Sequence, residues 1–313
     1  MTKLAFVFPG QGSQSVGMMT EWGDNQSLVD DTFTEASDAL GYDLTTITRE
    51  GPAEKLNQTE VTQPAMLAAG VAAYRVWQRG ESQPADIFAG HSLGEYSALV
   101  CAGSLGFTDA IKLVAERGRL MQSAVTEGEG AMAAIIGLDD DNVIKACDLV
   151  DEGIVSAVNF NSPGQVVIAG NSNSVERAMQ NAKDLGAKRA LPLPVSVPSH
   201  CALMQDAAEA LALKLAETDI QMPEKPVIHN QNAQPAASAD EIRERLKLQL
   251  FQPVLWVSCV EAMNSSGTNT LIEFGPGKVL TGLTRRINRS MNAHAVFDSD
   301  SLQKTQQTLA ENT

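Results

Sequence analysis

The stretch "IFAGHSLGEYSALV", Ile87 to Val100, decides the fold. Its first four residues predict a short buried strand, and the residues from Gly94 onward predict a helix. Between them, "GHSLG" (90–94) fits G-x-S-x-G, the nucleophile elbow, in which two glycines allow a sharp turn that presents the Ser92 hydroxyl at the sheet edge. A chain with 24 glycines could contain this pattern by coincidence. The strand before it and the helix after it favour a real elbow.

The segments before the elbow alternate between strand-like and helix-like patterns. A strand is expected at Leu4 to Phe8, and helices are expected from Leu28 to Leu40 and from Pro64 to Trp77. Pro64 would be the first helical residue, because proline tolerates that position. Such alternation favours a parallel sheet flanked by helices. Together with the elbow, it predicts an α/β fold with an α/β-hydrolase-like parallel-sheet core.

The middle of the chain has a different order of expected strands and helices. The elements expected there follow the order β-α-β-β-α-β and end with a strand in "AKRALPLPV" (187–195). This order is typical of a ferredoxin-like unit. We therefore predict a ferredoxin-like small subdomain at residues 128–197, inserted into a large α/β domain made of residues 1–127 and 198–313.

Composition excludes several classes of function. The 313 residues carry a formal charge of −15, which would repel the phosphates of nucleic acid. The longest mostly apolar stretch, Pro64 to Tyr74, is far too short to cross a membrane, and the apolar start before Pro9 is too short for a signal peptide. We therefore expect a cytoplasmic protein. The four cysteines are widely spaced, which fits neither a zinc site nor a disulfide framework and predicts free thiols.

A second glycine turn, "FPGQGSQ" (8–14), follows the first expected strand. It resembles the start of a nucleotide-binding loop, but Ser15 stands where G-x-G-x-x-G requires its third glycine, and the lysine of a P-loop is missing. A nucleotide site is therefore not favoured. The turn still brings backbone N–H groups close to any anion at the end of the strand.

A serine nucleophile needs a base, and the chain has four histidines. His91 adjoins the serine on a sharp turn, so its side chain diverges and a structural role is expected. His200 lies in a loop where the chain re-enters the large domain, a usual place for a catalytic group. His229 follows a strand-like segment and His294 lies in a polar tail, and for both an ordinary surface or core histidine is the favoured interpretation.

Arg117 is out of place on an amphipathic helix expected from Ala110 to Ala124. The helical repeat puts it on the apolar face with Val114 and Met121. A buried guanidinium needs a partner, because an unpaired buried charge costs several kcal/mol. That partner could be a carboxylate of the protein or the carboxylate of a ligand, which the arginine fork would hold through two parallel hydrogen bonds.

Taken together, the motifs resemble malonyl-CoA:acyl carrier protein transacylases of bacterial type II fatty acid synthesis. The resemblance extends from about residue 3 to 290, with the motifs in the expected order. The matching segments are "FPGQGSQ" (8–14), "TQPA" (62–65), "GHSLGEYSAL" (90–99), Arg117, "NFNSPGQVVIAG" (159–170), "VPSH" (197–200) and "EFGPGKVLTGL" (273–283).

The resemblance implies a role for each matching residue. Ser92 would be the nucleophile and His200 its base, with the backbone carbonyl of Gln249 orienting the histidine in place of a triad acid. Gln11 and Leu93 would donate backbone N–H groups to the oxyanion. Arg117 would bind the free carboxylate of the malonyl group. Other substrate contacts are expected at four residues: Gln63, Met121, Asn161 and Gln165.

The resemblance also implies partners. Malonyl-CoA would be the acyl donor and acyl carrier protein a transient acceptor, with no metal or other cofactor, and the enzyme would be a monomer. Because carrier proteins of this kind are acidic, docking on a chain of charge −15 requires a local basic patch. Candidate residues are Lys188, Arg189, Arg285, Arg286 and Arg289. They are expected near the entrance of the active site, which Lys278 would mark. A cluster of this kind is more often simply a solvated surface.

The implied reaction is a ping-pong acyl transfer through a malonyl-serine, catalysed by an acyl-carrier-protein S-malonyltransferase. Two other functions remain open. A serine hydrolase would use the same elbow, although Arg117 on an apolar face and the lack of an evident triad acid argue against it. A module that binds carrier protein or CoA without catalysis would not need Ser92 and His200. Tolerance for larger acyl groups depends on the packing around Met121 and Val197.

Overall fold

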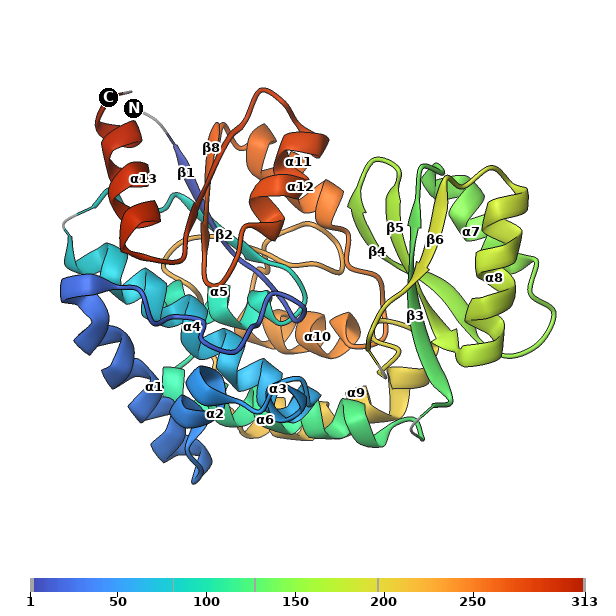
Figure 1. Ribbon diagram of the computed structural model, residues 1–313, viewed down its shortest axis with the longest axis horizontal. Helices are drawn as coiled ribbons and strands as arrows, with labels where there is room; N and C mark the ends of the chain where they lie inside the picture. The colour runs from blue at the N-terminus through green and yellow to red at the C-terminus, as the bar shows by residue number, and fades with distance from the viewer. Residues whose placement is uncertain (1–2, 81, 127, 196, 312–313) are drawn as a thin grey trace.

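The computed structural model describes residues 3–80, 82–126, 128–195 and 197–311. A five-stranded parallel sheet forms the large domain, with strand order β7-β2-β1-β8-β9 (Figure 1). The strands are β1 (Leu4–Phe8), β2 (Ile87–Gly90), β7 (Val227–Ile228), β8 (Thr270–Phe274) and β9 (Asn292–Val296). The expected α/β fold with a parallel-sheet core is confirmed, and β1 and β2 have the predicted bounds.

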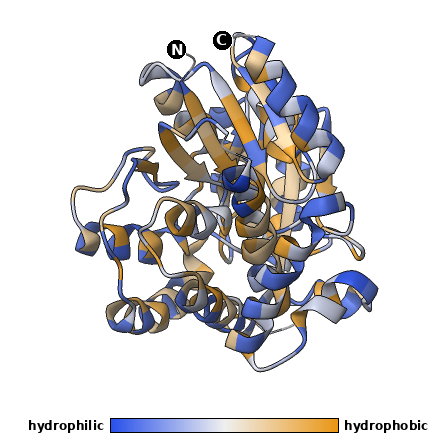
Figure 2. Cartoon of the chain, turned by 90° about the vertical axis from the view of Figure 1, so that its left-hand side faces the viewer, coloured by the Kyte–Doolittle hydropathy of each residue, from blue (hydrophilic) through white to orange (hydrophobic). Residues whose placement is uncertain are grey.

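Helices cover both faces of this sheet. The helical segments of the large domain are η1 (Gly23–Asn25), α1 (Gln26–Leu40), α2 (Leu44–Glu50), α3 (Ala53–Leu56), α4 (Thr59–Arg79), α5 (Gly94–Cys101), α6 (Phe107–Ser123), η2 (Ala202–Met204), α9 (Gln205–Glu217), α10 (Ala239–Gln249), α11 (Trp256–Ser265), α12 (Val279–Ile287) and α13 (Ser299–Glu311). Hydrophobic residues dominate the strands that these helices enclose (Figure 2).

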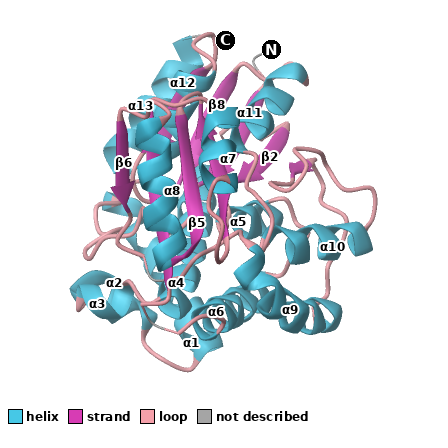
Figure 3. Ribbon diagram, turned by 90° about the vertical axis from the view of Figure 1, so that its right-hand side faces the viewer, coloured by secondary structure: helices cyan, strands magenta, loops and turns pink. Residues whose placement is uncertain are grey.

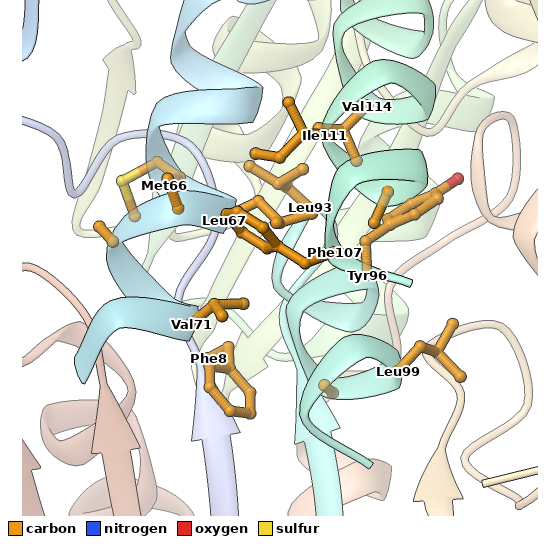
Figure 4. Close-up of a cluster of buried hydrophobic side chains, with 14 of the residues drawn as sticks. Phe8, Met66, Leu67, Val71, Leu93, Tyr96, Leu99, Phe107, Ile111 and Val114 are labelled. Carbon is orange, nitrogen blue, oxygen red and sulfur yellow. The ribbon is translucent and has the colours of Figure 1, made fainter. Parts of the chain in front are cut away.

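The central strand β1 is buried on both faces, because its side chains alternate between two cores. Phe6 and Phe8 face a core formed with α1, α4 and α6, and Figure 4 shows part of it around Phe8. Ala5 and Val7 face a second core formed with α11 and α12. In the register of the sheet, Phe8 pairs with Gly90, so the glycine turn after β1 and the elbow after β2 meet at one edge.

The small subdomain is an antiparallel four-stranded sheet with the order β4-β5-β3-β6. Its elements follow the predicted βαββαβ order: β3 (Gly130–Ile136), α7 (Asp140–Asp148), β4 (Val155–Ser162), β5 (Gln165–Asn171), α8 (Ser172–Asp184) and β6 (Arg189–Pro192). Helices α7 and α8 cover one face of the sheet (Figure 3). The other face packs on Cys201. The domain boundaries stay a prediction, and residue 127 lies outside the described residues.

Three local predictions are wrong. Helix α4 begins at Thr59, so Pro64 lies inside it, because nearly every residue from Thr59 to Ala73 is buried and this packing outweighs the one hydrogen bond that proline removes. The last strand of the subdomain was predicted over residues 187–195, but β6 ends at Pro192, because Pro194 has no N–H group with which to continue the ladder. His294 lies in edge strand β9 rather than in a tail, because β9 buries one side against the body.

Candidate active site

Ser92 stands on a tight turn between β2 and α5. A Cβ atom on Gly90 would overlap the backbone of Gly94, so the turn requires glycine at this close approach. Ser92 itself has a φ of 52°, a strained value for a residue with a side chain. The Asn230 side chain clamps the turn: its Oδ1 accepts a hydrogen bond from the Ser92 N–H at 2.6 Å, and its Nδ2 donates to the Gly90 carbonyl at 2.6 Å. The predicted elbow geometry is therefore present.

His200 contacts the serine hydroxyl. Its Nε2 lies 2.8 Å from Ser92 Oγ, and its Nδ1 lies 2.6 Å from the backbone carbonyl oxygen of Gln249. A carbonyl oxygen only accepts, so Nδ1 carries the proton and Nε2 is free to accept the hydroxyl proton. Burial, together with the nearby Arg117 guanidinium, lowers the pKa of His200 to about 3. The imidazole is therefore neutral near pH 7, as a general base must be.

Arg117 points its guanidinium at the same hydroxyl from helix α6. Its side chain is 1% exposed. It donates from Nη1 to Gln63 Oε1 at 2.9 Å, and from Nη2 to Gln249 Oε1 at 3.0 Å and Ser92 Oγ at 3.4 Å. The guanidinium carbon lies over the Tyr96 ring, 5.5 Å from the ring centroid. Within the described residues, none of the arginine's hydrogen bonds goes to a carboxylate, although burial lowers the pKa of Arg117 and the nearby Glu95 carboxylate partly offsets this effect.

A cavity of about 110 Å³ opens over these groups. It is much smaller than a pocket for a drug-sized ligand and suits a short acyl group. Both domains contribute, with Met132 on β3 and Asn159 on β4. The lining residues are Gln11, His91, Ser92, Leu93, Arg117, Met121, Met132, Asn159, Leu193, Val195, Val197, Ser199 and His200. Of the residues predicted from sequence, Ser92, His200, Arg117, Gln11, Leu93 and Met121 therefore meet at one cavity.

The glycine turn that carries Gln11 packs directly on the elbow. A Cβ atom on Gly10 would lie 2.6 Å from the His91 carbonyl oxygen, so only glycine allows this approach. The His91 N–H donates to the Phe8 carbonyl at 3.0 Å, which joins the end of β1 to the elbow. Gln11 and Leu93 therefore reach the cavity from two adjacent turns, where backbone N–H groups can face a developing oxyanion.

Three predicted substrate contacts lie outside the residues that line the cavity. Gln63 is buried behind Arg117 and holds its Nη1. Asn161 Oδ1 lies 2.8 Å from Nε2 of His91, so it supports the histidine beside the elbow. Gln165 Oε1 accepts a hydrogen bond from Arg286 at 2.7 Å. These side chains hold protein groups in this structure.

The candidate docking residues are exposed, and we call the group Lys188, Arg189, Arg285 and Arg286 the basic rim. In the subdomain sheet, Ile136 on β3 pairs with Arg189 on one side and with Gln165 on the other. Because Gln165 also holds Arg286, these two arginines belong to one connected surface. Arg289 does not extend a helical face with Arg285 as predicted, because α12 ends at Ile287.

Sequence reasoning missed the buried carboxylate of Glu95. This side chain is 0% exposed and accepts hydrogen bonds from His229 Nδ1 at 2.7 Å, the Asn230 N–H at 2.8 Å and Gln249 Nε2 at 2.9 Å. An ordinary surface or core histidine was expected at His229, and the side chain is buried in the core. The signal that revealed Arg117 also applies to Glu95: a charged residue stands in an otherwise apolar helix, "GEYSALV" (94–100).

Three further findings concern the described residues. No group of three or more His, Cys, Asp and Glu side chains among them lies close enough together to hold a metal ion. None of the helices in the described ranges is long and apolar enough to span a bilayer. The four cysteines are free thiols, as predicted, and three of them are buried.

Known proteins resemble this chain along nearly its whole length. Residues 5–308 match the acyl transferase domain family. The chain is 56% identical over 303 residues to the malonyl CoA-acyl carrier protein transacylase of Escherichia coli strain K12, an alignment that covers 96% of this chain and 98% of that protein.

Solved structures extend the similarity to the fold. An acyl carrier protein S-malonyltransferase from Vibrio cholerae superposes with a TM-score of 0.94 at 55% identity, covering 97% of this chain and 100% of that one. A malonyl-transacylase in complex with its type II PKS acyl-carrier protein gives a TM-score of 0.96 at 52% identity, covering 98% of this chain and 100% of that one.

Proposed function

Because the chain belongs to the malonyl CoA-acyl carrier protein transacylases of the acyl transferase family, we propose that it transfers malonyl groups through a malonyl-Ser92 intermediate. The donor is malonyl-CoA, and the acceptor is the phosphopantetheine thiol of acyl carrier protein. The reaction is ping-pong: CoA leaves before the carrier protein's thiol attacks.

In the first half-reaction, Ser92 Oγ attacks the thioester carbonyl while its proton passes to Nε2 of His200. The 2.8 Å contact between these atoms supports this transfer, and the Gln249 carbonyl keeps the imidazole in the accepting tautomer. Backbone N–H groups of Gln11 and Leu93 stabilise the tetrahedral oxyanion. The carbon–sulfur bond then breaks, and His200 returns the proton to the departing CoA thiolate.

The second half-reaction reverses these steps with a new thiol. His200 takes the proton of the phosphopantetheine thiol, the thiolate attacks the malonyl ester, and the carbon–oxygen bond to Ser92 breaks. The Ser92 oxygen recovers its proton from His200. The basic rim supplies the positive surface for the acidic carrier protein on an otherwise acidic chain.

The observation that carries the choice of a malonyl group is the environment of Arg117. Its guanidinium is 1% exposed, lies 3.4 Å from Ser92 Oγ and is hydrogen-bonded only to neutral oxygens within the described residues. A buried cation beside the nucleophile favours an acyl group that brings its own carboxylate. Met121 and Val197 line the same small cavity and would limit the size of that group.

The direct test is mass spectrometry of the protein after brief exposure to malonyl-CoA. We expect one malonyl adduct, mapped to Ser92 by peptide analysis, and removal of the adduct by carrier protein that bears its phosphopantetheine thiol. Ser92→Ala should abolish the adduct, whereas Ser97→Ala, the same change on the helix α5 that follows the elbow, should retain it. An adduct on another residue would contradict the proposal.

The same experiment separates the two other functions. A hydrolase would release CoA continuously from malonyl-CoA without any thiol acceptor, whereas a transferase should release about one equivalent and stop. A binding module without catalytic activity would form no adduct at all.

A further inference from the structure

Glu95 is a buried carboxylate that the proposed reaction steps do not use. It occupies the second position of α5, three residues after the nucleophile, and its side chain is 0% exposed. Three donors converge on it: Nδ1 of His229 on one oxygen, and the Asn230 N–H and Gln249 Nε2 on the other. Since burying a carboxylate is costly, a site with three donors indicates that its position is closely defined.

The side-chain amide of Gln249 connects Glu95 to Arg117. Its Nε2 donates to Glu95 Oε2 at 2.9 Å and to the Ser92 carbonyl at 3.0 Å, while its Oε1 accepts from Arg117 Nη2 at 3.0 Å. An amide turned the other way would set its NH₂ group against the guanidinium, donor against donor. The carboxylate of Glu95 therefore fixes which end of the amide faces Arg117.

A second connection leads from Glu95 to the elbow. The same oxygen that holds Gln249 also accepts the Asn230 N–H, and the Asn230 side chain holds the strained turn at the Ser92 N–H and the Gly90 carbonyl. Glu95 thus contacts the supports of both the nucleophile and the carboxylate-binding arginine without lining the cavity itself.

We propose that Glu95 is a positioning residue that selects for acyl groups with a carboxylate, because its reach to Gln249 sets the position of the Arg117 guanidinium. This inference rests on the proposed function. The Gln249 amide keeps Glu95 from pairing directly with Arg117, so the guanidinium stays available to the incoming carboxylate. Shortening the carboxylate should release the amide and the guanidinium while the backbone carbonyl of Gln249 still holds His200.

The test compares two substitutions at Glu95. Glu95→Asp keeps the charge but shortens the side chain by one methylene, and Glu95→Gln keeps the reach but removes the charge. The readout is the ratio of Ser92 acylation rates with malonyl-CoA and acetyl-CoA. We expect Glu95→Asp to lower this ratio about 10-fold, in the range of one lost hydrogen bond to a charged group. Glu95→Gln should stay within about 3-fold of wild type, since its amide oxygen can accept from Asn230 and Gln249 while its NH₂ group donates to Nδ1 of His229, which accepts in the other tautomer of the imidazole.

Two further variants test whether Glu95 acts on Arg117 through the side chain of Gln249. Gln249→Ala keeps the backbone carbonyl that contacts His200 and should lower the ratio by the same factor as Glu95→Asp, with no additional loss in the double variant. Glu273→Asp is the matched control, because Glu273 is also a fully buried carboxylate but accepts the N–H groups of Leu280 and Thr281. It should lower the melting temperature and leave the ratio unchanged.

Three results would overturn the inference: equal losses with malonyl-CoA and acetyl-CoA in Glu95→Asp, a larger effect of Glu95→Gln than of Glu95→Asp, or an unchanged ratio in Gln249→Ala. The ratio measured in Gln249→Ala still tests the inference if Glu95→Asp does not fold. Wild-type protein that acquires no malonyl group on Ser92 would contradict the proposed function instead, so the two failures are distinguishable.

Discussion

Arg117 and Arg286 each donate a hydrogen bond to a glutamine side chain, but their surroundings are opposite. Arg117 is 1% exposed on α6 and contacts Gln63, Gln249 and the Ser92 hydroxyl, whereas Arg286 is exposed on α12 and donates a hydrogen bond to Gln165. The first arginine is fixed by two buried glutamines, Gln63 and Gln249, and by the half-buried Ser92. The second belongs to the basic rim, where water and salt reach every charge.

This difference teaches what each region can contribute. A desolvated charge interacts strongly with a ligand, so Arg117 can discriminate between acyl groups that differ by one carboxylate. Exposed charges are screened and contribute little each, so the basic rim can raise the rate of encounter and weakly favour an acidic partner. Selectivity for the acyl group and recognition of the carrier protein should therefore respond differently to mutation.

The largest effect is expected from Arg117→Ala. The malonyl carboxylate loses its buried partner, so kcat/KM for malonyl-CoA should fall by about 100-fold or more, while transfer from acetyl-CoA is spared or improved. Initial rates with both donors measure this effect. Arg119→Ala is the matched control, because Arg119 lies on the same helix but is exposed and pairs with Glu116. Equal losses with both donors would refute the carboxylate role.

A second effect of the buried region concerns pH. Because burial and Arg117 lower the pKa of His200 to about 3, the base stays neutral well below the ordinary histidine range. Acylation of Ser92 by acetyl-CoA should therefore change by less than about two-fold between pH 5 and pH 7. In Arg117→Met, the loss of acylation rate at low pH should begin at a higher pH than in wild type, since one cause of the lowered pKa of His200 is removed.

Rapid-quench measurement of CoA release across this pH range tests the prediction, with circular dichroism to establish that each sample is folded. Wild-type activity that halves near pH 6.5 would contradict it, because His200 would then titrate like an exposed histidine.

The sequence predicted the parts of this site that depend on local pattern. The elbow at Ser92 follows from glycine spacing between a strand and a helix, and the buried position of Arg117 follows from helical periodicity. The loop position made His200 the candidate among the four histidines, and the family resemblance then implied its role as the base, because the sequence alone does not show which loop lies beside the elbow.

The supports of the site could not be predicted in this way. Glu95 and Asn230 are 135 residues apart in the chain, and Gln249 reaches them only because α10 packs beside the elbow. Contacts of this kind depend on tertiary packing rather than on periodicity. The same reason explains Pro64, since burial of α4 overrides the preference of proline for the first turn.

The smallest effect is expected at the basic rim. Arg286→Ala should raise the KM for acyl carrier protein by about 3- to 10-fold at low salt, because one screened contact with an acidic partner is lost. The Ser92 acylation step with malonyl-CoA should stay within about two-fold of wild type. Arg177→Ala is the matched control, since Arg177 is an exposed arginine on α8 with a 3.8 Å contact to Glu152.

Salt separates this effect from a structural one. At higher ionic strength, Arg286→Ala and wild type should have similar KM values for acyl carrier protein, because salt screens the same charge that the substitution removes. The ratio of malonyl to acetyl transfer should not change in either condition. A loss of acyl selectivity in Arg286→Ala, or a KM difference that persists at high salt, would mean that the rim and the buried site are coupled and that carrier recognition does not rest on screened charge alone.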